Sequence, residues 1–346
     1  MFQRSALSLF ASVLTVAILA SEKTASAFVT PSSTAHTAHR AQASRTKATA
    51  TSLKMSADEF TIMVNGMPGP MATAAAEACL RKGLKLSPIA MTGPDIEPST
   101  ITVSDTVTGT SSNVRLIPST EMDELKSAIA GAKEAAGGEK NFLAIDYTHP
   151  SAVNSNALFY VEQGVPFVMG TTGGDREKLI QDVNNAEHFA VIAPNMGKQI
   201  VAMQAALEDL ADRYPSAFAG YKLDVQESHQ KTKADTSGTA KAVIDSLKKL
   251  SDDDFTYDDV DMIRDDQRAM EFGVPEKGLN GHAFHTYTFT SADGSVQFQL
   301  KHNVVGRTVY AEGTADAVKF LGQKMKTEPK GKVFTMINVL EAGALD

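Results

Sequence analysis

The residues best suited to chemistry lie in one stretch, 227–240, whose sequence is ESHQKTKADTSGTA. Within it, His229 can exchange a proton near neutral pH and Lys233 brings a positive charge. The small residues of Ser237-Gly238-Thr239 allow a carboxylate to approach the backbone closely. The stretch therefore predicts a site that binds a carboxylate-bearing substrate and protonates it. A capped helix after a solvated loop is the structural alternative that the same residues allow.

The elements on either side must hold this stretch in place. Residues 219–225 predict a strand that ends at Glu227. Apolar residues then recur at i, i+3, i+4 and i+7 from Ala240, which is the pattern of one helix face. Thr236 or Ser237 is the natural N-cap of that helix. A helix N-terminus offers unpaired backbone N–H groups and positive potential, so this position suits an anion.

Composition narrows the class of protein. A chain of 346 residues suits one large or two modest domains, and 42% hydrophobic with 21% charged residues is ordinary for a globular enzyme. One cysteine, Cys79, excludes a disulfide framework and a cysteine-based metal site, and we expect no metal. Beyond residue 54 the chain holds 27 basic and 40 acidic residues, a net charge of −13, which argues against a nucleic-acid partner.

The N-terminus has the composition of a two-part targeting signal. Residues 1–27 predict a signal peptide, with a basic start, an apolar run too short for a confident membrane span, and an Ala-Ser-Ala cleavage site. Residues 28–54 predict a plastid transit peptide, because they are rich in Ser, Thr and Ala, basic, and free of acids. The junction resembles that of algae with secondary, red-lineage plastids, so we expect the mature protein in the plastid stroma and not in a membrane. An ordinary secreted protein is the alternative, against which the lone cysteine argues.

A glycine-containing loop follows the first predicted strand of the folded part, which begins near Asp58. The predicted strand is 60–65 and the predicted helix is 72–80. Glycines between a strand and a helix permit a tight turn and the close approach of a pyrophosphate to the helix N-terminus. The loop therefore predicts dinucleotide contacts from Gly66, Met67, Pro68, Gly69, Pro70 and Met71.

The end of the second predicted strand, 84–91, bears on the choice of cofactor. An NAD-preferring site usually places an acid there to bind the ribose hydroxyls. Here the strand ends in Thr92-Gly93-Pro94, and the acid Asp95 comes later. We therefore expect NADPH, whose 2′-phosphate an acid would repel. No arginine is placed to hold that phosphate, so NADH stays an alternative.

Helices and strands alternate through the next part of the chain. The patterns predict helices at 121–135 and 151–163 and strands at 142–145, 165–169 and 189–192. Polar or glycine-rich sequences follow these strands, namely DYTHP, GTTGG and APNMG. This order predicts an α/β fold with a Rossmann-type, doubly wound parallel sheet and a ligand at its carboxyl edge. We expect this dinucleotide-binding domain to span 58–196 and to be completed by 315–346.

A second, α+β domain is predicted over residues 197–314, entered through a helix at 197–214. Residues 284–290 and 296–302 alternate in polarity and flank Ala-Asp-Gly, a hairpin signal, so we expect an open, mostly antiparallel sheet. Residues 251–268 carry eight aspartates and predict a solvated loop, with a metal site as the alternative. A late helix is predicted at 318–325.

Together these motifs resemble one known family, dihydrodipicolinate reductase, also called 4-hydroxy-tetrahydrodipicolinate reductase, of the diaminopimelate route to lysine. The similar segments run in the family's order over nearly all of residues 60–340. They are the Gly66 loop, DYTHP at 146–150, GTTG at 170–173, APNM at 193–196 and the 227–240 stretch. Residues 281–286, GHAFHT, resemble the plant-type branch.

The resemblance implies roles for individual residues. His229 matches the family's acid/base histidine and Lys233 its catalytic lysine. The substrate-carboxylate loop is matched by Ser237, Gly238 and Thr239, and Gln230 is expected to be a further hydrogen-bonding partner for the substrate. The cofactor contacts are matched by the Gly66–Met71 loop with Thr148, Gly170, Thr171, Thr172, Pro194, Asn195 and Met196. Two departures keep Lys231 as the alternative to Lys233: Gln230 replaces a second histidine of the bacterial motif, and the proline before Ser-Gly-Thr is absent.

The resemblance also implies an activity, the NADPH-dependent reduction of a cyclic, unsaturated dicarboxylate, and assembly as a homodimer or homotetramer. Another two-domain nicotinamide oxidoreductase acting on an amino-acid-derived acid is one alternative. An acylating semialdehyde dehydrogenase would need a cysteine in a strand-end loop, whereas Cys79 falls in a predicted helix. A catalytically inactive NADPH-binding regulatory protein is the other alternative, which the presence of both His229 and Lys233 disfavours.

Overall fold

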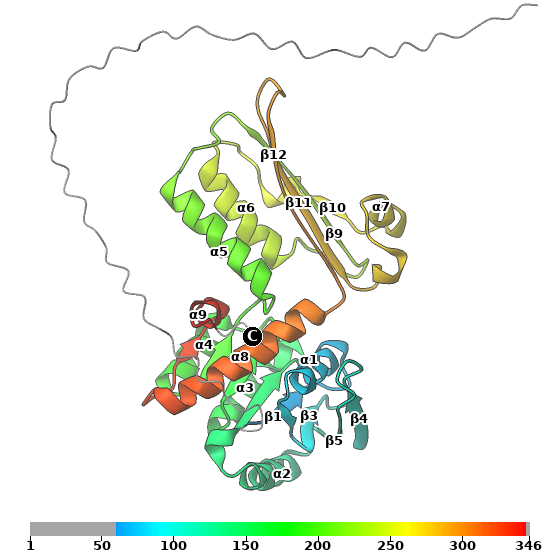
Figure 1. Ribbon diagram of the computed structural model, residues 1–346, viewed down its shortest axis with the longest axis vertical. Coiled ribbons are helices and arrows are strands. Elements are labelled where there is room, and N and C mark those ends of the chain that lie inside the picture. Colours follow the sequence, from blue (N-terminus) through cyan, green and yellow to red (C-terminus); the bar gives the residue numbers. More distant parts are fainter. Residues whose placement is uncertain (1–59, 344–346) are drawn as a thin grey trace, which may run out of the picture. The chain divides into compact units, whose positions relative to one another are not determined.

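The computed structural model describes residues 60–343, all of which fall within one compact unit, Lys54–Asp346 (Figure 1). The predicted signal and transit peptides lie outside the described residues. In the described part, no helix is long and apolar enough to span a membrane.

Thirteen strands and nine α-helices make up residues 60–343. The strands are β1 (Thr61–Asn65), β2 (Lys85–Leu86), β3 (Ile89–Thr92), β4 (Ser99–Ser104), β5 (Ser111–Pro118), β6 (Phe142–Asp146), β7 (Phe167–Met169), β8 (Ala190–Ile192), β9 (Lys222–His229), β10 (Asp261–Ile263), β11 (His282–Thr290), β12 (Gln297–Val305) and β13 (Val333–Phe334). The helices are α1 (Pro70–Arg81), α2 (Met122–Ala135), α3 (Val153–Glu162), α4 (Arg176–Asn185), α5 (Lys198–Arg213), α6 (Gly238–Leu250), α7 (Asp266–Glu271), α8 (Thr308–Thr327) and α9 (Met336–Glu341).

Six strands form a parallel sheet in the order β13-β8-β7-β6-β1-β2. Strands β1, β6, β7 and β8 are buried along their whole length, as expected where helices cover both faces of a parallel sheet. The last residues of β1, β6 and β7, which are Asn65, Asp146 and Met169, are register partners. The loops that follow these strands therefore leave from the same edge, and the predicted Rossmann-type sheet is confirmed.

The prediction of one strand over 84–91 is wrong. β2 pairs with β1 in the parallel sheet, whereas β3 pairs with β5 in a separate three-stranded sheet of order β3-β5-β4. Pro88 lies between β2 and β3. Because proline has no backbone N–H and restricts the residue before it, the ladder is interrupted there and the chain moves to the second sheet.

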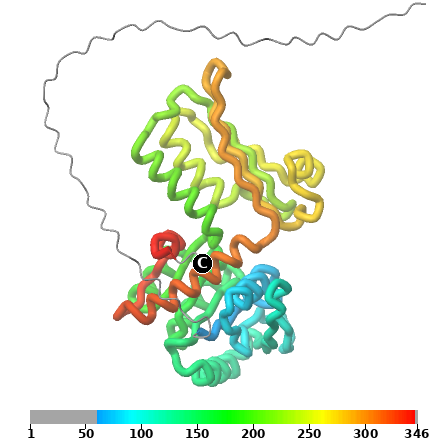
Figure 2. The backbone as a smooth tube through the Cα atoms, viewed as in Figure 1, coloured from blue at the N-terminus to red at the C-terminus, as the bar shows by residue number. Residues whose placement is uncertain are grey.

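The C-terminal part of the chain returns to the parallel sheet. Helix α8 is much longer than the predicted 318–325 and packs against α1, and β13 pairs in parallel with β8. In the tube of Figure 2, α8 and β13 are the orange and red segments that lie beside the blue-to-green strands and helices. Gly322 of α8 allows close packing, because a Cβ there would lie 2.6 Å from the Phe60 ring.

A second, four-stranded sheet has the order β10-β9-β11-β12. β11 is antiparallel to both β9 and β12, and β10 is parallel to β9. Helices α5 and α6 lie side by side over one face (Figure 1), where their apolar side chains share a core with Leu223, Val225, Tyr287 and Phe289. The predicted open, mostly antiparallel sheet is confirmed.

The aspartate-rich segment 251–268 is more ordered than predicted. It contains β10, which adds an edge to the sheet, and it runs into α7, whose N-cap is Asp265. Ile263 is buried with Ala269, Val274 and Phe284 in a small core of its own. Hydrophobic residues spaced between the aspartates were the signal for this structure, and the high charge obscured it.

Candidate functional site

The Gly66–Met71 loop connects the end of β1 to α1, as predicted. Gly66 has φ +96°, and a Cβ there would lie 2.1 Å from the carbonyl oxygen of Tyr147, so only glycine fits. Gly69 is the N-cap of α1, no side chain caps this helix, and Pro70 is its first residue. The N-terminus of α1 therefore presents backbone N–H groups at the carboxyl edge of the sheet, which suits a phosphate.

A buried carboxyl group organises the neighbouring loops. Asp146, at the end of β6, is fully buried. Its oxygens accept hydrogen bonds from Tyr160 Oη at 2.6 Å, Thr171 Oγ1 at 2.6 Å, Thr148 Oγ1 at 2.8 Å and Asn156 Nδ2 at 3.0 Å. These donors come from three segments, so Asp146 fixes the loops after β6 and β7 relative to each other.

Two cavities open along this edge. One of about 420 Å³ is lined by Thr148, Gly170, Thr171, Thr172, Pro194, Asn195, Met196 and five other residues, among them Thr239. The other, about 550 Å³, is lined by Gly66, Pro68, Gly69, Pro70, Met71 and Thr148 together with the β3 end. The cavities share Met71, Tyr147 and Thr148. Every predicted cofactor residue except Met67, which is buried, lines one cavity or both.

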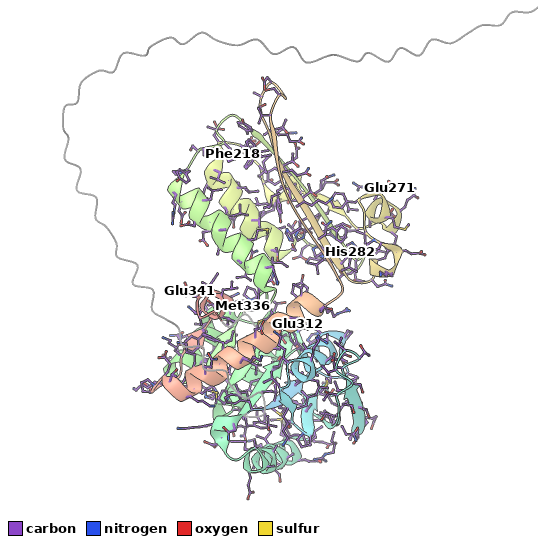
Figure 3. All side chains as sticks on the ribbon, viewed as in Figure 1. Phe218, Glu271, His282, Glu312, Met336 and Glu341 are labelled. Carbon is purple, nitrogen blue, oxygen red and sulfur yellow. The ribbon has the colours of Figure 1, made fainter. Side chains whose placement is uncertain are left out.

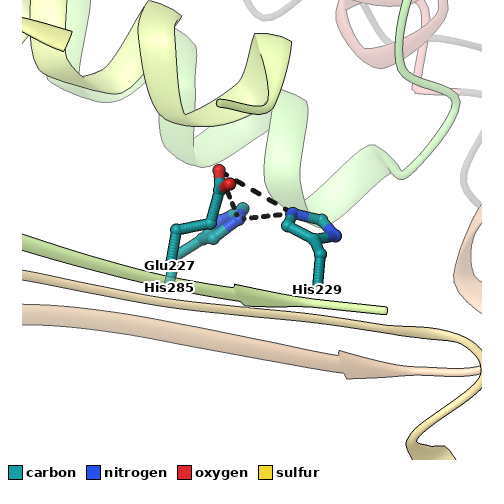
Figure 4. Close-up of side chains that lie close together, drawn as sticks. All are labelled: Glu227, His229 and His285. Atoms are coloured by element: carbon teal, nitrogen blue, oxygen red, sulfur yellow. Dashed lines mark hydrogen bonds and ion pairs between the residues drawn. The ribbon is translucent and has the colours of Figure 1, made fainter. Parts of the chain in front are cut away.

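The second group of predicted residues gathers at the end of β9. This strand runs to His229, two residues beyond the predicted end, so His229 belongs to the strand rather than to the loop. Glu227 and His229 are two residues apart and lie on the same face of β9. His285 of β11 is the direct register partner of Glu227. The three side chains therefore converge, as Figure 4 shows.

The contacts in this cluster are short. His229 Nε2 lies 3.1 Å from His285 Nε2, and Glu227 Oε2 lies 3.5 Å from His285 Nε2 and 3.8 Å from His229 Nε2. His285 Nδ1 lies 2.8 Å from His302 Nε2 on β12. Glu227 and His285 are buried, and 11% of the His229 side chain is exposed. His229 is thus the member of the cluster that a ligand can reach.

Burial and hydrogen bonding set the charges of the cluster. Burial lowers the pKa of His229 to about 3, against the opposing attraction of the Glu227 carboxylate, so the ring is neutral in the free protein near pH 7. Burial by itself would raise the pKa of Glu227, but hydrogen bonds from His285, Ser237 and Arg264 outweigh it and hold that pKa well below its usual range. The cluster therefore combines an ionised carboxylate with a neutral imidazole.

Arg264 holds the loop that follows His229. Its guanidinium donates to Glu227 Oε1 at 2.6 Å and to the carbonyl oxygens of Lys233 at 2.8 Å and Asp235 at 3.2 Å. The side chain is 17% exposed. A single half-buried arginine from the aspartate-rich segment thus ties β9 to the loop that carries the predicted lysine.

The two candidate lysines have different surroundings. Lys233 Nζ is 2.7 Å from Asp235, and 23% of its side chain is exposed. Lys231 pairs with Asp266 of α7 at 2.5 Å, and 63% of its side chain is exposed. The half-buried Gln230 accepts a bond from the Lys233 backbone N–H through its carbonyl oxygen. Lys233 is the more enclosed of the two lysines and lies in the loop that Arg264 holds.

Helix α6 begins as predicted, at the Ser-Gly-Thr sequence. Ser237 is its N-cap and accepts a 3.1 Å bond from the backbone N–H of Ala240. The Ser237 backbone N–H donates to Glu227 Oε2 at 2.9 Å. Gly238 is the first residue of α6, and a Cβ there would meet no atom within 4 Å. Thr239 Oγ1 accepts a 3.1 Å bond from Asn195 Nδ2, which links this helix start to the loop after β8.

Sequence reasoning missed His285, His302 and Arg264 as parts of this site. His285 stands in the GHAFHT segment, which was noted for its resemblance but given no role. His285 lies opposite Glu227 because of the register between two strands that are more than fifty residues apart in the sequence. A local sequence pattern does not predict such a register. Arg264 falls in the segment 251–268, for which the sequence predicts a solvated loop.

Comparison with known proteins identifies the relatives of this chain. A family model described as the N-terminus of dihydrodipicolinate reductase matches residues 60–196, and a model of the C-terminus of the same enzyme matches residues 199–340. The chain is 44% identical over 290 residues to the "Probable 4-hydroxy-tetrahydrodipicolinate reductase 2, chloroplastic" of Oryza sativa subsp. japonica, covering 83% of this chain and 84% of the relative.

A second plant relative agrees with this match. The "4-hydroxy-tetrahydrodipicolinate reductase 1, chloroplastic" of Arabidopsis thaliana is 43% identical over 287 residues, covering 82% of this chain and 78% of the relative. A dipicolinate-bound dihydrodipicolinate reductase from Paenisporosarcina sp. TG-14 superposes with a TM-score of 0.49 at 16% identity, covering 80% of this chain and 97% of that structure. On its family-model matches and its identity to the plant enzymes, the chain belongs to the dihydrodipicolinate reductase family.

Proposed function

We propose that this chain reduces 4-hydroxy-tetrahydrodipicolinate or its dehydrated form with NADPH, and that His229 or Lys233 donates or routes the proton. The reductase activity follows from the family; the cofactor preference and the residue roles are the proposal. The observation that carries it is the 3.1 Å bond between Asn195 Nδ2 and Thr239 Oγ1. This bond places the predicted cofactor loop after β8 beside the predicted carboxylate loop at the start of α6.

The residues at the sheet edge fit a dinucleotide. The α1 N-terminus has no side-chain cap, so its backbone N–H groups can bind a phosphate. Gly66 lets the preceding turn pack against the Tyr147 backbone. Gly170 packs directly against the Tyr147 ring, which a Cβ at this position would meet at 2.3 Å. None of the residues that line the cavity at the β3 end is acidic, which favours NADPH over NADH. When bound, NADPH supplies a hydride to a ring carbon conjugated with the imine.

The chain's own residues would bind the dicarboxylate and deliver the proton. One carboxylate would lie on the N-terminus of α6, at Ser237, Gly238 and Thr239, with Gln230 as a further hydrogen-bonding partner. Lys233 would neutralise charge on the bound anion. As negative charge develops next to the reduced carbon, Lys233 or His229 donates or routes the proton that quenches it.

The test is the decrease in absorbance of the reduced nicotinamide, with freshly generated substrate and with NADPH and NADH supplied separately. We expect turnover with NADPH. His229→Ala and Lys233→Ala should each raise the barrier by about 2–4 kcal/mol, a loss of about 30- to 1,000-fold in rate. Lys231→Ala is the matched control, and its rate should stay close to that of the unchanged protein.

Two outcomes would contradict this proposal. Binding of NADPH without turnover would favour the regulatory alternative or another acid substrate. A loss of activity in Lys231→Ala that exceeds the loss in Lys233→Ala would transfer the catalytic role to Lys231.

The proposed location is the plastid, in keeping with the relatives named chloroplastic. We further propose the stroma of a secondary plastid as the final location. A fluorescent protein fused after residues 1–54 should enter the plastid of a diatom or similar alga, whereas a fusion after residues 28–54 alone should remain outside it. Import of the second fusion would contradict the two-part signal.

We also propose that the chain assembles as a homodimer or homotetramer through the face of the four-stranded sheet opposite α5 and α6. Exposed positions on this face, such as Asp224 of β9 and Gln299 and Lys301 of β12, would gain cover from a partner. Sedimentation equilibrium should give a multiple of the chain mass, and a monomer at micromolar concentration would refute the assembly.

A further inference from the structure

The cluster at the end of β9 has the geometry of a metal site. We propose that Glu227, His229 and His285 bind Zn²⁺, and that the bound ion prevents turnover. Among residues 60–343 this is the one group of three or more potential ligand residues whose atoms converge in this way. The inference goes beyond the reductase activity, although its inhibitory consequence rests on the proposed role of His229.

The backbone creates the arrangement. Residues two apart on a strand point to the same face, which brings Glu227 and His229 together on β9. His285 enters from the neighbouring strand β11 directly opposite Glu227. Two ligands from one strand and one from its register partner make a three-ligand set on a rigid sheet, a better scaffold for a precise site than a loop.

The distances fit a tetrahedral ion. Zn–N and Zn–O bonds of about 2.0–2.2 Å separate neighbouring ligand atoms by about 3.3–3.5 Å in a tetrahedron. The three separations here are 3.1, 3.5 and 3.8 Å. An ion can therefore occupy the centre with only small side-chain shifts. It would replace the proton that the two Nε2 atoms otherwise share.

The surroundings orient the ligands as metal sites require. His285 Nδ1 is 2.8 Å from His302 Nε2, so its Nε2 can face the ion while its other nitrogen is hydrogen-bonded. Glu227 Oε1 is held by Arg264 at 2.6 Å, which leaves Oε2 directed at the histidines. Arg264 also opposes a cation, but two imidazoles and a carboxylate are the ligand set of zinc sites that keep an open position.

The fourth side of the site faces the proposed carboxylate loop. Ser237 Oγ lies 3.4 Å from His285 Nε2, and the partly exposed His229 provides the route of entry. An ion bound to His229 Nε2 would remove this nitrogen from proton transfer. Zn²⁺ would therefore inhibit the reductase by occupying the position of the proton.

Binding is tested without substrate, so that it does not depend on the proposed activity. The purified protein, without a histidine tag, is titrated with Zn²⁺ by calorimetry and with Co²⁺ by visible absorption. Because His36 and His39 lie in the N-terminal segment, the titrated protein carries His36→Gln and His39→Gln. We expect one site per chain, with the intense visible bands of four-coordinate Co²⁺ and loss of these bands when Zn²⁺ is added.

Three variants locate the site. His285→Gln and His229→Gln should each abolish the Co²⁺ bands, and His302→Gln should weaken binding by about 10- to 100-fold because it orients His285. His282→Gln is the matched control. His282 starts β11 (Figure 3), and its bonds go to Ser228 Oγ and the Gly278 carbonyl oxygen rather than to the cluster. Circular dichroism melting of each variant establishes that it is folded.

The outcomes are separable. If no site binds, or if binding survives in the folded His229→Gln and His285→Gln variants, the proposal is overturned. If Zn²⁺ binds but the protein shows no reductase activity, the metal site stands and the proposed function falls. If both hold, Zn²⁺ should inhibit the unchanged protein and leave the residual activity of His285→Gln unaffected; inhibition of both alike would overturn the inhibitory role.

Discussion

At the scale of single residues, the site depends on two buried acids that their hydrogen-bond partners hold in position. Asp146 receives its hydrogen bonds from Thr148, Asn156, Tyr160 and Thr171, and Glu227 receives its bonds from Arg264 and Ser237 among others. A buried carboxyl group is costly unless it is bonded in this way. Each of these two acids therefore fixes the loops around it, one at the proposed cofactor site and one at the proposed substrate site.

The proposed preference for NADPH is tested by a change at one residue, Gly93. A Cβ at Gly93 would have only an ordinary contact, 3.7 Å from Ile96, so a side chain fits at this edge of the cavity. Gly93→Asp should repel the 2′-phosphate of NADPH and lower kcat/KM for it by about 10- to 100-fold, a Coulomb effect of about 1–3 kcal/mol, while NADH is less affected. Gly93→Asn is the isosteric control. Equal losses in both variants would mean that the 2′-phosphate lies elsewhere.

Cys79 makes stability depend on pH in the alkaline range. Burial raises the pKa of its thiol to about 12 from an ordinary value of 9.0. Between these values the unfolded chain loses the proton and the folded chain keeps it, so the contribution to stability is complete below pH 9 and is lost as pH rises towards 12.

The comparison that isolates this effect is with Cys79→Ala, whose packing cost does not vary with pH. The difference in unfolding free energy between the two proteins, measured in urea, should shrink by about 1.4 kcal/mol per pH unit above pH 9, or by about 2 kcal/mol at pH 10.5. If the difference in unfolding free energy between the two proteins stays constant from pH 8 to 10.5, the predicted effect of the Cys79 thiol is contradicted.

At the scale of elements, two helical glycines with the same intrinsic propensity should respond oppositely to alanine. In α2, Gly131 is exposed and a Cβ there meets nothing within 4 Å, so Gly131→Ala should stabilise the protein by about 0.5–1 kcal/mol. In α8, a Cβ on Gly313 would lie 1.8 Å from the carbonyl oxygen of Met196, so Gly313→Ala should destabilise by about 1–3 kcal/mol.

Gly313→Ala should also weaken binding at the proposed cofactor site. Relief of the clash must displace Met196, which lines the cavity next to Asn195. Fluorescence titration should show weaker NADPH binding for Gly313→Ala and unchanged binding for Gly131→Ala. Unchanged stability and binding in Gly313→Ala would show that α8 can shift away from the loop after β8.

The elements also show how much of the fold can be predicted from the sequence. The alternation of apolar strands with amphipathic helices predicted the parallel sheet, because each element has its own local periodicity. The break between β2 and β3 was signalled by Pro88 but was overlooked. The β4 and β5 hairpin was not predicted, since its polar, largely exposed β4 has no apolar face long enough to show a period.

At the scale of the whole molecule, the site was only half predictable. The predicted cofactor residues follow parallel strands, and the carboxyl ends of these strands must meet at one edge of the sheet. The order of the motifs along the chain was therefore sufficient to predict that these residues lie together. The cluster of Glu227, His229 and His285 arises from a pairing of β9 with β11 across an intervening helix, an edge strand and a short helix. Only the global topology supplies that register.

The same topology joins three distant segments through one buried acid. Asp316 of α8 is fully buried and forms ion pairs with Lys82, just after α1, and with Lys198, the first residue of α5. An uncompensated charge in such a place is costly, so removing one partner costs far more than the intact pair contributes. Asp316→Asn should therefore lower the free energy of unfolding by about 3–5 kcal/mol, measured in urea.

An exposed pair on α4 gives the matched control. Lys178 and Asp182 form an i,i+4 pair at 2.7 Å, with 59% of the lysine side chain exposed. Asp182→Asn should lower the free energy of unfolding by at most about 0.5 kcal/mol, and 0.5 M salt should abolish this loss. The loss caused by Asp316→Asn should persist in salt, because dissolved ions screen buried charges much less than exposed ones. If the two variants lose equal stability, or if salt removes the Asp316 effect, then water reaches this triad. The helices α1, α5 and α8 would then be held together by their other contacts, which include the Arg81–Glu312 ion pair between α1 and α8.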